Sequence, residues 1–227
     1  MHVYITHLQA TLLEMLISLF FAVIFSFFLA IIFNFFPWIK KLLMPCFVIL
    51  QNLPMFVLAP FLLACFGWGL FSIVLPTILM LSFPLTLSFS KGLSATPEEY
   101  IHFYRLHGAK PLKILLSIRM PFALPHIFSG LKIAAASSAT GAVAGEWAGA
   151  QKGLGVLMQI FRRQFDFEGV FICLGLVIAL SLSCYFLVSA LEKILLFGCY
   201  GYKKGLLSYL RVSNFFQWVQ VKQSKLL

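Results

Sequence analysis

The sequence predicts an all-α integral membrane protein with five membrane-spanning helices. Of its 227 residues, 61% are apolar and only 11% are charged, whereas about a quarter of the residues in a soluble domain are charged. Several long stretches contain no charged residue at all, and each could cross a hydrocarbon core of about 30 Å as a helix. Such a composition argues against a soluble enzyme, a nucleic-acid-binding domain and a disordered chain.

The uncharged stretches place the spans. Residues 15–39 would form roughly 37 Å of helix at about 1.5 Å per residue. Residues 42–90 are long enough for two helices, which the glycine-rich segment 66–69 would separate. Residues 169–191 form the last uncharged stretch. We expect the five spans at about 11–38, 43–66, 70–90, 121–149 and 169–193.

The fourth of these spans contains two charged residues, Lys132 and Glu146. Their separation corresponds to about 21 Å of helix, so they cannot pair with each other on one helix. Each must reach one face of the membrane or face protein instead of lipid. Glu146 could gate the outer mouth, pair with Lys152 or an arginine of the next loop, or anchor at the interface with Trp147.

The distribution of Lys and Arg predicts an external N-terminus and a cytoplasmic C-terminus. The external side then keeps only Lys152, Arg162 and Arg163. A basic tail at 198–227 would lie on the cytoplasmic side, against lipid. The basic residues assigned to the cytoplasm are Lys40, Lys41, Lys91, Arg105, Lys110, Lys113, Arg119, Lys193, Lys203, Lys204, Arg211, Lys222 and Lys225.

The cytoplasmic loop at 91–120 carries signals of local order. Thr96, Pro97 and Glu99 form the pattern of a helix N-cap, first-turn proline and capping-box glutamate. Gly108 stands where a helix-ending glycine is expected, so the pattern predicts a helix over 97–107, and Pro111 begins another helix that leads to the fourth span.

The predicted loop helix has an aromatic face made by Tyr100, Phe103, Tyr104 and His107. That face could pack on its own membrane domain, or it could dock into a groove of a cytoplasmic partner.

The same loop resembles a known family. The run that begins Gly108-Ala109 and ends Ile118-Arg119-Met120-Pro121 is similar to the "EAA" loop of ABC-importer permeases, in which a glycine precedes an isoleucine and a leucine-proline. Where that loop usually has Glu-x-Ala, this chain has residues 102–104, His-Phe-Tyr. The resemblance extends over about residues 8–195 and includes segments 50–54 and 141–155. It is strongest to the nitrate, sulfonate and taurine group and to the thiamine-precursor (hydroxymethylpyrimidine) group.

The resemblance implies a permease domain at 1–197, of the type I ABC-importer kind, in the bacterial plasma (inner) membrane, with the loop helix as coupling helix. It implies two permease copies that form a homodimer, two cytoplasmic ATPases that bind ATP and Mg²⁺, and an external substrate-binding protein. No phosphate-binding G-x-x-x-x-G-K-[ST] motif occurs in the chain, so we expect no cofactor of its own and no catalytic residue. The residues implied for ATPase coupling are Glu98, Glu99, His102, Tyr104, Arg105, Gly108, Ala109 and Pro121.

Two further groups of residues are functional candidates. Gln51 and Asn52 are amides within a long uncharged run beside Pro54, so we place them with Glu146 on a translocation path. Gly141, Gly145 and Gly149 recur every helical turn and predict close packing of helices, within the subunit or between two subunits.

The sequence therefore predicts the transmembrane subunit of an ATP-driven importer for a small polar solute, with hydroxymethylpyrimidine as the leading substrate. Permeases for nitrate, sulfonate, taurine or riboflavin are the alternatives within the family. An independent channel or secondary transporter is more distant, because the chain lacks inverted repeats. The histidines lack metal-site spacing, so no metal site and no intramembrane enzyme is expected.

Overall fold

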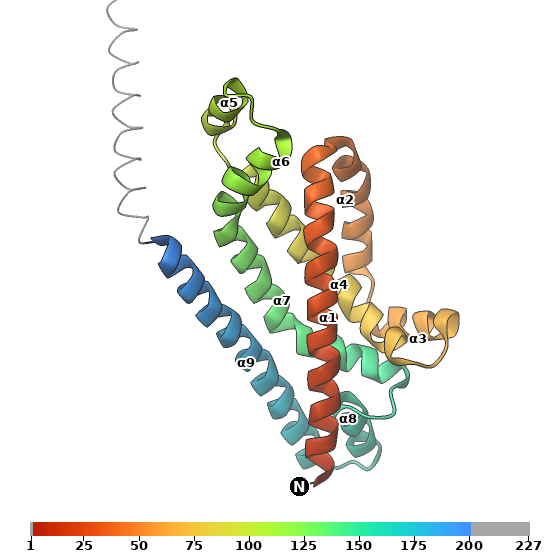
Figure 1. The fold of residues 1–227 in the computed structure, drawn as a ribbon. Helices are drawn as coiled ribbons and strands as arrows, with labels where there is room; N and C mark the ends of the chain where they lie inside the picture. The colour runs from red at the N-terminus through yellow and green to blue at the C-terminus, as the bar shows by residue number, and fades with distance from the viewer. Residues whose placement is uncertain (1, 201–227) are drawn as a thin grey trace, which may run out of the picture. The chain divides into compact units, whose positions relative to one another are not determined.

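The computed structural model describes residues 2–200, and every regular element among them is helical (Figure 1). Residues up to Ser189 form one compact unit, and the last helix continues from there to Tyr200. The predicted basic tail lies outside the described residues from position 201 onward. The helices are α1 (His2–Phe35), α2 (Pro37–Asn52), α3 (Met55–Phe66), α4 (Leu70–Ser94), α5 (Glu98–Leu106), α6 (Pro111–Ile114), η1 (Leu115–Arg119, a π-helix), α7 (Met120–Gly149), α8 (Leu154–Arg163) and α9 (Phe167–Tyr200).

Four helical segments are long and apolar enough to cross a membrane, and a bent pair of helices raises the number to five. The expected all-α membrane fold is therefore confirmed. The four segments are Val3–Phe35, Leu70–Ser94, Pro111–Gly149 and Phe167–Leu196.

The second predicted span, 43–66, is not one continuous helix. It is divided into α2 and α3, which are bent by 108° relative to each other. The break falls at Leu53 and Pro54, which both have extended backbone angles. Proline disfavours helical geometry in the residue before it and cannot donate a backbone hydrogen bond, so the helix ends there.

The glycine-rich break at 66–69 falls where the sequence predicts it. α3 ends at Phe66, and α4 begins at Leu70. Gly67 adopts a φ of 77°, a backbone conformation that residues other than glycine rarely adopt. This turn separates α3 from α4, and the two helices contact each other.

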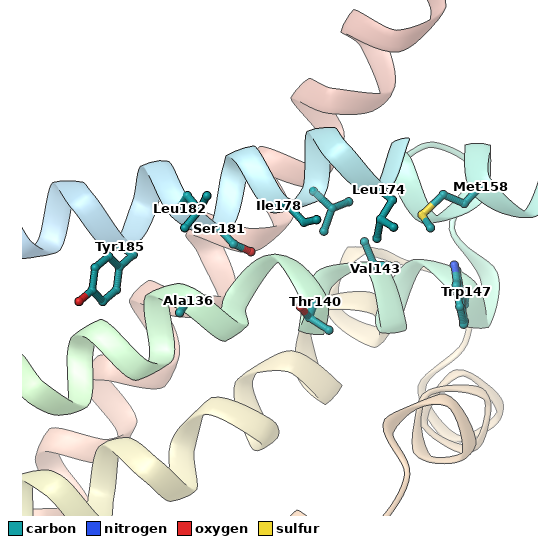
Figure 2. Close-up of a pocket in the computed structure, with 11 residues that line it drawn as sticks. Ala136, Thr140, Val143, Trp147, Met158, Leu174, Ile178, Ser181, Leu182 and Tyr185 are labelled. Atoms are coloured by element: carbon teal, nitrogen blue, oxygen red, sulfur yellow. The ribbon is translucent and has the colours of Figure 1, made fainter. Parts of the chain in front are cut away.

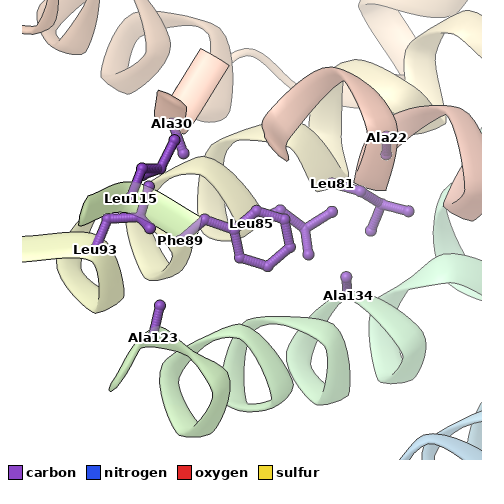
Figure 3. Close-up of a cluster of buried hydrophobic side chains, with 9 residues drawn as sticks. All are labelled: Ala22, Ala30, Leu81, Leu85, Phe89, Leu93, Leu115, Ala123 and Ala134. Carbon is purple, nitrogen blue, oxygen red and sulfur yellow. The ribbon is translucent and has the colours of Figure 1, made fainter. Parts of the chain in front are cut away.

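The core lies between α1, α4 and α7, which pack directly on one another (Figures 1 and 3). Large side chains of α4 meet small side chains of the other two helices, so the helix axes approach closely. The buried residues of this cluster are Ala22, Ala30, Leu81, Leu85, Phe89, Leu93, Leu115, Ala123 and Ala134.

The glycine series of α7 lies against α3 and α4 of the same chain. A Cβ atom on Gly141 would lie 2.6 Å from the Thr77 methyl carbon, and one on Gly145 would collide with the Ile73 carbonyl oxygen. A Cβ on Gly149 would lie 2.7 Å from a methyl carbon of Leu63. These contacts are within one subunit, and they leave no room for a larger residue on this face of α7.

The charge pattern predicts only a connecting loop between the last two spans, but the structure has a helix there, α8. Leu154 and Leu157 are buried on one face, and Arg162 and Arg163 are exposed at its end. Two leucines three residues apart, followed by two arginines, are the pattern from which the helix could have been predicted.

Candidate functional site

The loop helix α5 is shorter at both ends than the sequence predicts, and its start is built differently. It runs from Glu98 to Leu106, with Pro97 as N-cap and no side-chain hydrogen bond at that cap. The predicted capping box of Thr96 and Glu99 is therefore wrong. Thr96 Oγ1 is buried without a hydrogen-bond partner, while Glu98 and Glu99 are exposed in the first helical turn. Their negative charges there are favourable to the helix dipole.

The inner face of α5 packs on its own chain. Ile101 is buried in a cluster with Ile114 of α6 and Ile118 of η1. The ring of Tyr100 lies 5.6 Å from that of Phe122, at the start of α7. Tyr104 is half-buried at the edge of the same cluster. The loop helix is thus fixed to the base of α7 through apolar contacts.

The outer face of α5 is uncovered. Phe103 is 57% exposed and Leu106 is 85% exposed. The rings of Phe103 and His107 lie 4.3 Å apart, and His102 and Arg105 are exposed beside them. The aromatic residues expected on one face are therefore divided, because only Tyr100 and Tyr104 turn inward. An exposed apolar face of this kind is a candidate interaction surface.

α5 ends in a Schellman motif at Gly108. This glycine has a φ of 71°, its N–H donates to the Arg105 carbonyl at 3.0 Å, and the Ala109 N–H donates to the Tyr104 carbonyl at 3.0 Å. The left-handed conformation favours glycine at this position. The predicted turn at Gly108 is present and redirects the chain into α6.

A π-helix, η1, joins α6 to α7, and it places Arg119 against α1. The Arg119 guanidinium donates a hydrogen bond to the side-chain oxygen of Asn34, near the end of α1. Both residues are half-buried. Pro121 lies two residues later, exposed in the first turn of α7. η1 therefore contacts α5 through Ile118 and contacts α1 through Arg119.

The predicted path residues do not lie together. Gln51 and Asn52 are exposed at the end of α2, and the Asn52 amide donates to the Val48 carbonyl at 2.7 Å. Glu146 lies at the far end of α7 and is only 1% exposed.

Glu146 sits in a network of hydrogen bonds between α1, α7 and α8. Its carboxylate accepts from the Thr11 hydroxyl at 2.5 Å and from the Gly155 N–H at 2.5 Å. The Val156 N–H also contacts it. Two of these donors belong to the first turn of α8, where a negative charge is favourable. Its contacts are thus with α1 and α8, and not with Lys152 or an arginine, which was one of the three alternatives that the sequence left open.

Residues of α1 that the sequence did not single out complete this junction. The Thr11 hydroxyl accepts from the Leu154 N–H at 2.8 Å, and His7 Nδ1 accepts from the Gly153 N–H at 3.0 Å. Glu14 is buried beside Glu146 and makes a side-chain hydrogen bond with it. The spacing of His7, Thr11 and Glu14, three or four residues apart on one helix face, is the signal from which the group could have been found.

Trp147 closes the same end of α7 from the other side. Its indole N–H donates to the Gly155 carbonyl at 3.1 Å. Next to it, a largely apolar groove of about 650 Å³ lies between α7 and α9 (Figure 2). Thr140 of α7 and Ser181 and Tyr185 of α9 are the polar side chains among its lining residues.

The fold and the loop define a class of protein: a helical membrane protein with an ordered, partly uncovered helix between two of its spans. The particular family follows from comparison with known proteins. Residues 22–195 match the model of the binding-protein-dependent transport system inner membrane component family. The chain belongs to this family, as the resemblance predicts.

Individual relatives are consistent with this family assignment. A probable ABC transporter permease protein of Haemophilus influenzae is 36% identical over 180 residues, which cover 79% of this chain and 74% of the relative. The formylaminopyrimidine transport permease protein ThiX of Halalkalibacterium halodurans is 31% identical over 193 residues, covering 85% and 77%. In a solved inward-facing structure of the MetNI methionine ABC transporter, one chain matches with a TM-score of 0.72 at 18% identity, covering 86% of this chain and 96% of that one.

The chain is therefore a permease subunit of an ABC importer and not an enzyme. In these systems the ATPase is a separate subunit, and membership of the family implies an ATPase and a binding protein as partners.

Proposed function

We propose that this permease imports a pyrimidine precursor of thiamine, such as hydroxymethylpyrimidine, after an external binding protein has delivered it. The observation that supports this substrate class is the likeness to a formylaminopyrimidine transport permease over 85% of the chain. Permeases of one family carry different solutes, so nitrate, sulfonate, taurine and riboflavin are the competing substrates in the test below.

The outer face of α5 is proposed as the surface that receives the ATPase, which would bind ATP and Mg²⁺ itself. The uncovered Phe103 and Leu106 supply apolar contact area, and the neighbouring His102 and Arg105 supply polar contacts. The exposed Glu98 and Glu99 lie one turn earlier and add negative charge to the same surface. Force applied to α5 would reach α7 through the Ile101 cluster and reach α1 through the bond between Arg119 and Asn34.

Gln51 and Asn52 are proposed to line the path of the solute. They lie at the break between α2 and α3, where backbone groups freed from the helix need polar or aqueous surroundings. The path itself would form between two copies of the chain, arranged as a homodimer in the bacterial inner membrane. In each copy the N-terminus would be external and α5 cytoplasmic, as the distribution of basic residues favours.

The substrate is tested by uptake into proteoliposomes that contain the permease, its ATPase and its binding protein. We expect ATP-dependent uptake of radiolabelled hydroxymethylpyrimidine, and no uptake of taurine, nitrate or riboflavin. A reversed preference would contradict the proposed substrate and leave the importer function standing. Chains tagged at the C-terminus and probed with an impermeant protease test the topology, because a cytoplasmic C-terminus must be protected in intact cells.

A further inference from the structure

The junction of α1, α7 and α8 contains two carboxyl groups in contact with each other, and the proposed transport function uses neither. Glu146 is 1% exposed and Glu14 is 6% exposed. Both belong to helices that are long and apolar enough to cross a membrane. Isolated charges in such surroundings are costly and require compensation, so the way in which each carboxyl group is satisfied is informative.

Glu146 is surrounded by hydrogen-bond donors. The Thr11 hydroxyl, the Gly155 N–H and the Val156 N–H all point at its two oxygens. The fit is tight, because a Cβ atom on Gly155 would lie 2.8 Å from Oε2 and one on Gly153 would overlap the carboxyl group. A group that accepts from several donors at a helix N-terminus is suited to the ionised form.

Glu14 has the opposite surroundings. It lies three residues after Thr11, hence on the same face of α1, and its side chain hydrogen-bonds with that of Glu146. Its Oε2 is buried without a hydrogen-bond partner. The nearby Ser18 hydroxyl donates to the backbone carbonyl of Glu14 at 2.7 Å and not to its carboxyl group.

A hydrogen bond between two carboxyl groups requires a proton on one of them, since two ionised carboxylates only accept and repel each other. The donors around Glu146 assign the ionised role to it, which leaves the proton to Glu14. We propose that Glu14 and Glu146 form a binding site for one proton, held by the Glu14 carboxyl group and donated to the Glu146 carboxylate.

The other ionisable groups near Glu14 and Glu146 do not supply a positive charge that could take the place of the proton. On α1, the His7 ring faces the backbone of Gly153. On α8, Arg162 and Arg163 are exposed at the far end, and Lys152 is exposed before the helix. α9 contributes the Cys184 thiol to the adjoining apolar cluster, and α4 faces α7 with the Ile73 carbonyl. Within residues 2–200, neither carboxyl group is in contact with a basic side chain.

The proton links the packing of α8 to pH. Because the packed junction binds a proton that a loosened junction releases, lower pH favours the packed form. As the pH rises and the proton leaves, two adjacent negative charges repel, and α1 separates from α7 and α8. The site would thus sense the pH on the α8 side of the permease.

Infrared spectroscopy of the purified full-length permease tests the assignment directly, because a protonated carboxyl group has its own carbonyl band. We expect this band at neutral pH in the wild type and in the control variant Glu168→Gln, which alters an exposed carboxylate. We expect its complete loss in Glu14→Gln. A band that survives in Glu14→Gln, or that is missing from the wild type at neutral pH, would overturn the proposal.

Thermal unfolding gives a second readout that is independent of transport. A failure of the proton-site proposal can therefore be distinguished from a wrong substrate. Glu14→Gln keeps a donor toward Glu146, so it should unfold at the wild-type temperature and lose the fall in melting temperature at alkaline pH. Glu146→Gln replaces an acceptor with an amide and should melt about 5 °C lower, or fail to fold. A melting temperature that follows sodium concentration and ignores pH would identify a cation site instead and refute the proton site.

Discussion

The polar and aromatic side chains near the two ends of α7 differ in burial. At the α5 end, Phe103, Leu106 and His107 are exposed, and only the inner face of the loop helix is packed. At the α8 end, Glu146 and Thr11 are buried and hydrogen-bonded within the chain. At one end these groups are uncovered, and we propose that a partner binds them; at the other end they hold three helices together.

This difference separates two kinds of defect. A substitution on the outer face of α5 removes contacts that only a bound partner would make, so it should impair transport and spare stability. A substitution among the packed groups of α7 removes or strains contacts that already exist, so it should lower stability first.

The largest effect is expected for Gly145→Ala in α7. The added methyl group meets the Ile73 carbonyl oxygen of α4, which is backbone and cannot turn away. We expect a loss of about 2–3 kcal/mol in stability, measured by thermal unfolding in detergent. Gly175→Ala in α9 is the matched control, because nothing lies within 4 Å of the added carbon. Equal stability of the two variants would remove the argument for close packing.

The double substitution Phe103→Ala and Leu106→Ala should have the next largest effect. If these side chains form the centre of the ATPase contact, their loss should weaken ATPase binding about tenfold, or about 1.4 kcal/mol. Uptake should fall while the melting temperature stays unchanged. Leu112→Ala in α6, which is 61% exposed outside α5, serves as control. Normal binding by the double variant would move the docking surface away from α5.

Breaking the bond between Arg119 and Asn34 should have a smaller effect. A double-mutant cycle with Arg119→Ala and Asn34→Ala should show a coupling energy of about 1 kcal/mol in stability. We also expect ATP hydrolysis to continue with reduced uptake in each single variant, since α1 would no longer follow the loop. Independent, additive effects of the two substitutions would show that the bond does not connect these elements.

Substitutions at Gly108 should have the smallest effect on uptake. The position has a φ of 71° and open space around it, so only backbone strain is at issue. Gly108→Val should cost about 1–2 kcal/mol and lower uptake by tilting α6 against α5. Gly108→Asn should retain most uptake, because asparagine tolerates the left-handed conformation. Equal uptake by both variants would show that the turn geometry is unimportant for coupling.

Composition and charge were sufficient to predict the membrane fold, because a span requires little more than about 20 residues without charge. The same criterion cannot detect a sharp bend inside an uncharged run. The division of 43–66 into α2 and α3 occurs at Pro54, which carries no charge and so does not alter the charge pattern. The short helix α8 was hidden for a related reason: it lies among polar loop residues, where no long apolar stretch marks it.

The site was predictable to the extent that its signals are local. Gly108 and its turn follow from one residue and its neighbours. Thr96 also fits a local pattern, yet its side chain is buried where the cap should be, because the chain enters α5 through an extended Pro97. The pairing of Glu14 with Glu146 joins residues far apart in the chain, and only the packing of α1 on α7 reveals it.

Hydrogen exchange measured by mass spectrometry, with and without the ATPase bound, tests most directly the claim that the two ends of α7 have different roles. We expect that backbone amides of α5 and its Gly108 turn become protected when the ATPase binds, while those of α8 exchange slowly and equally in both states. Unchanged exchange at α5, or new protection confined to α8, would contradict it.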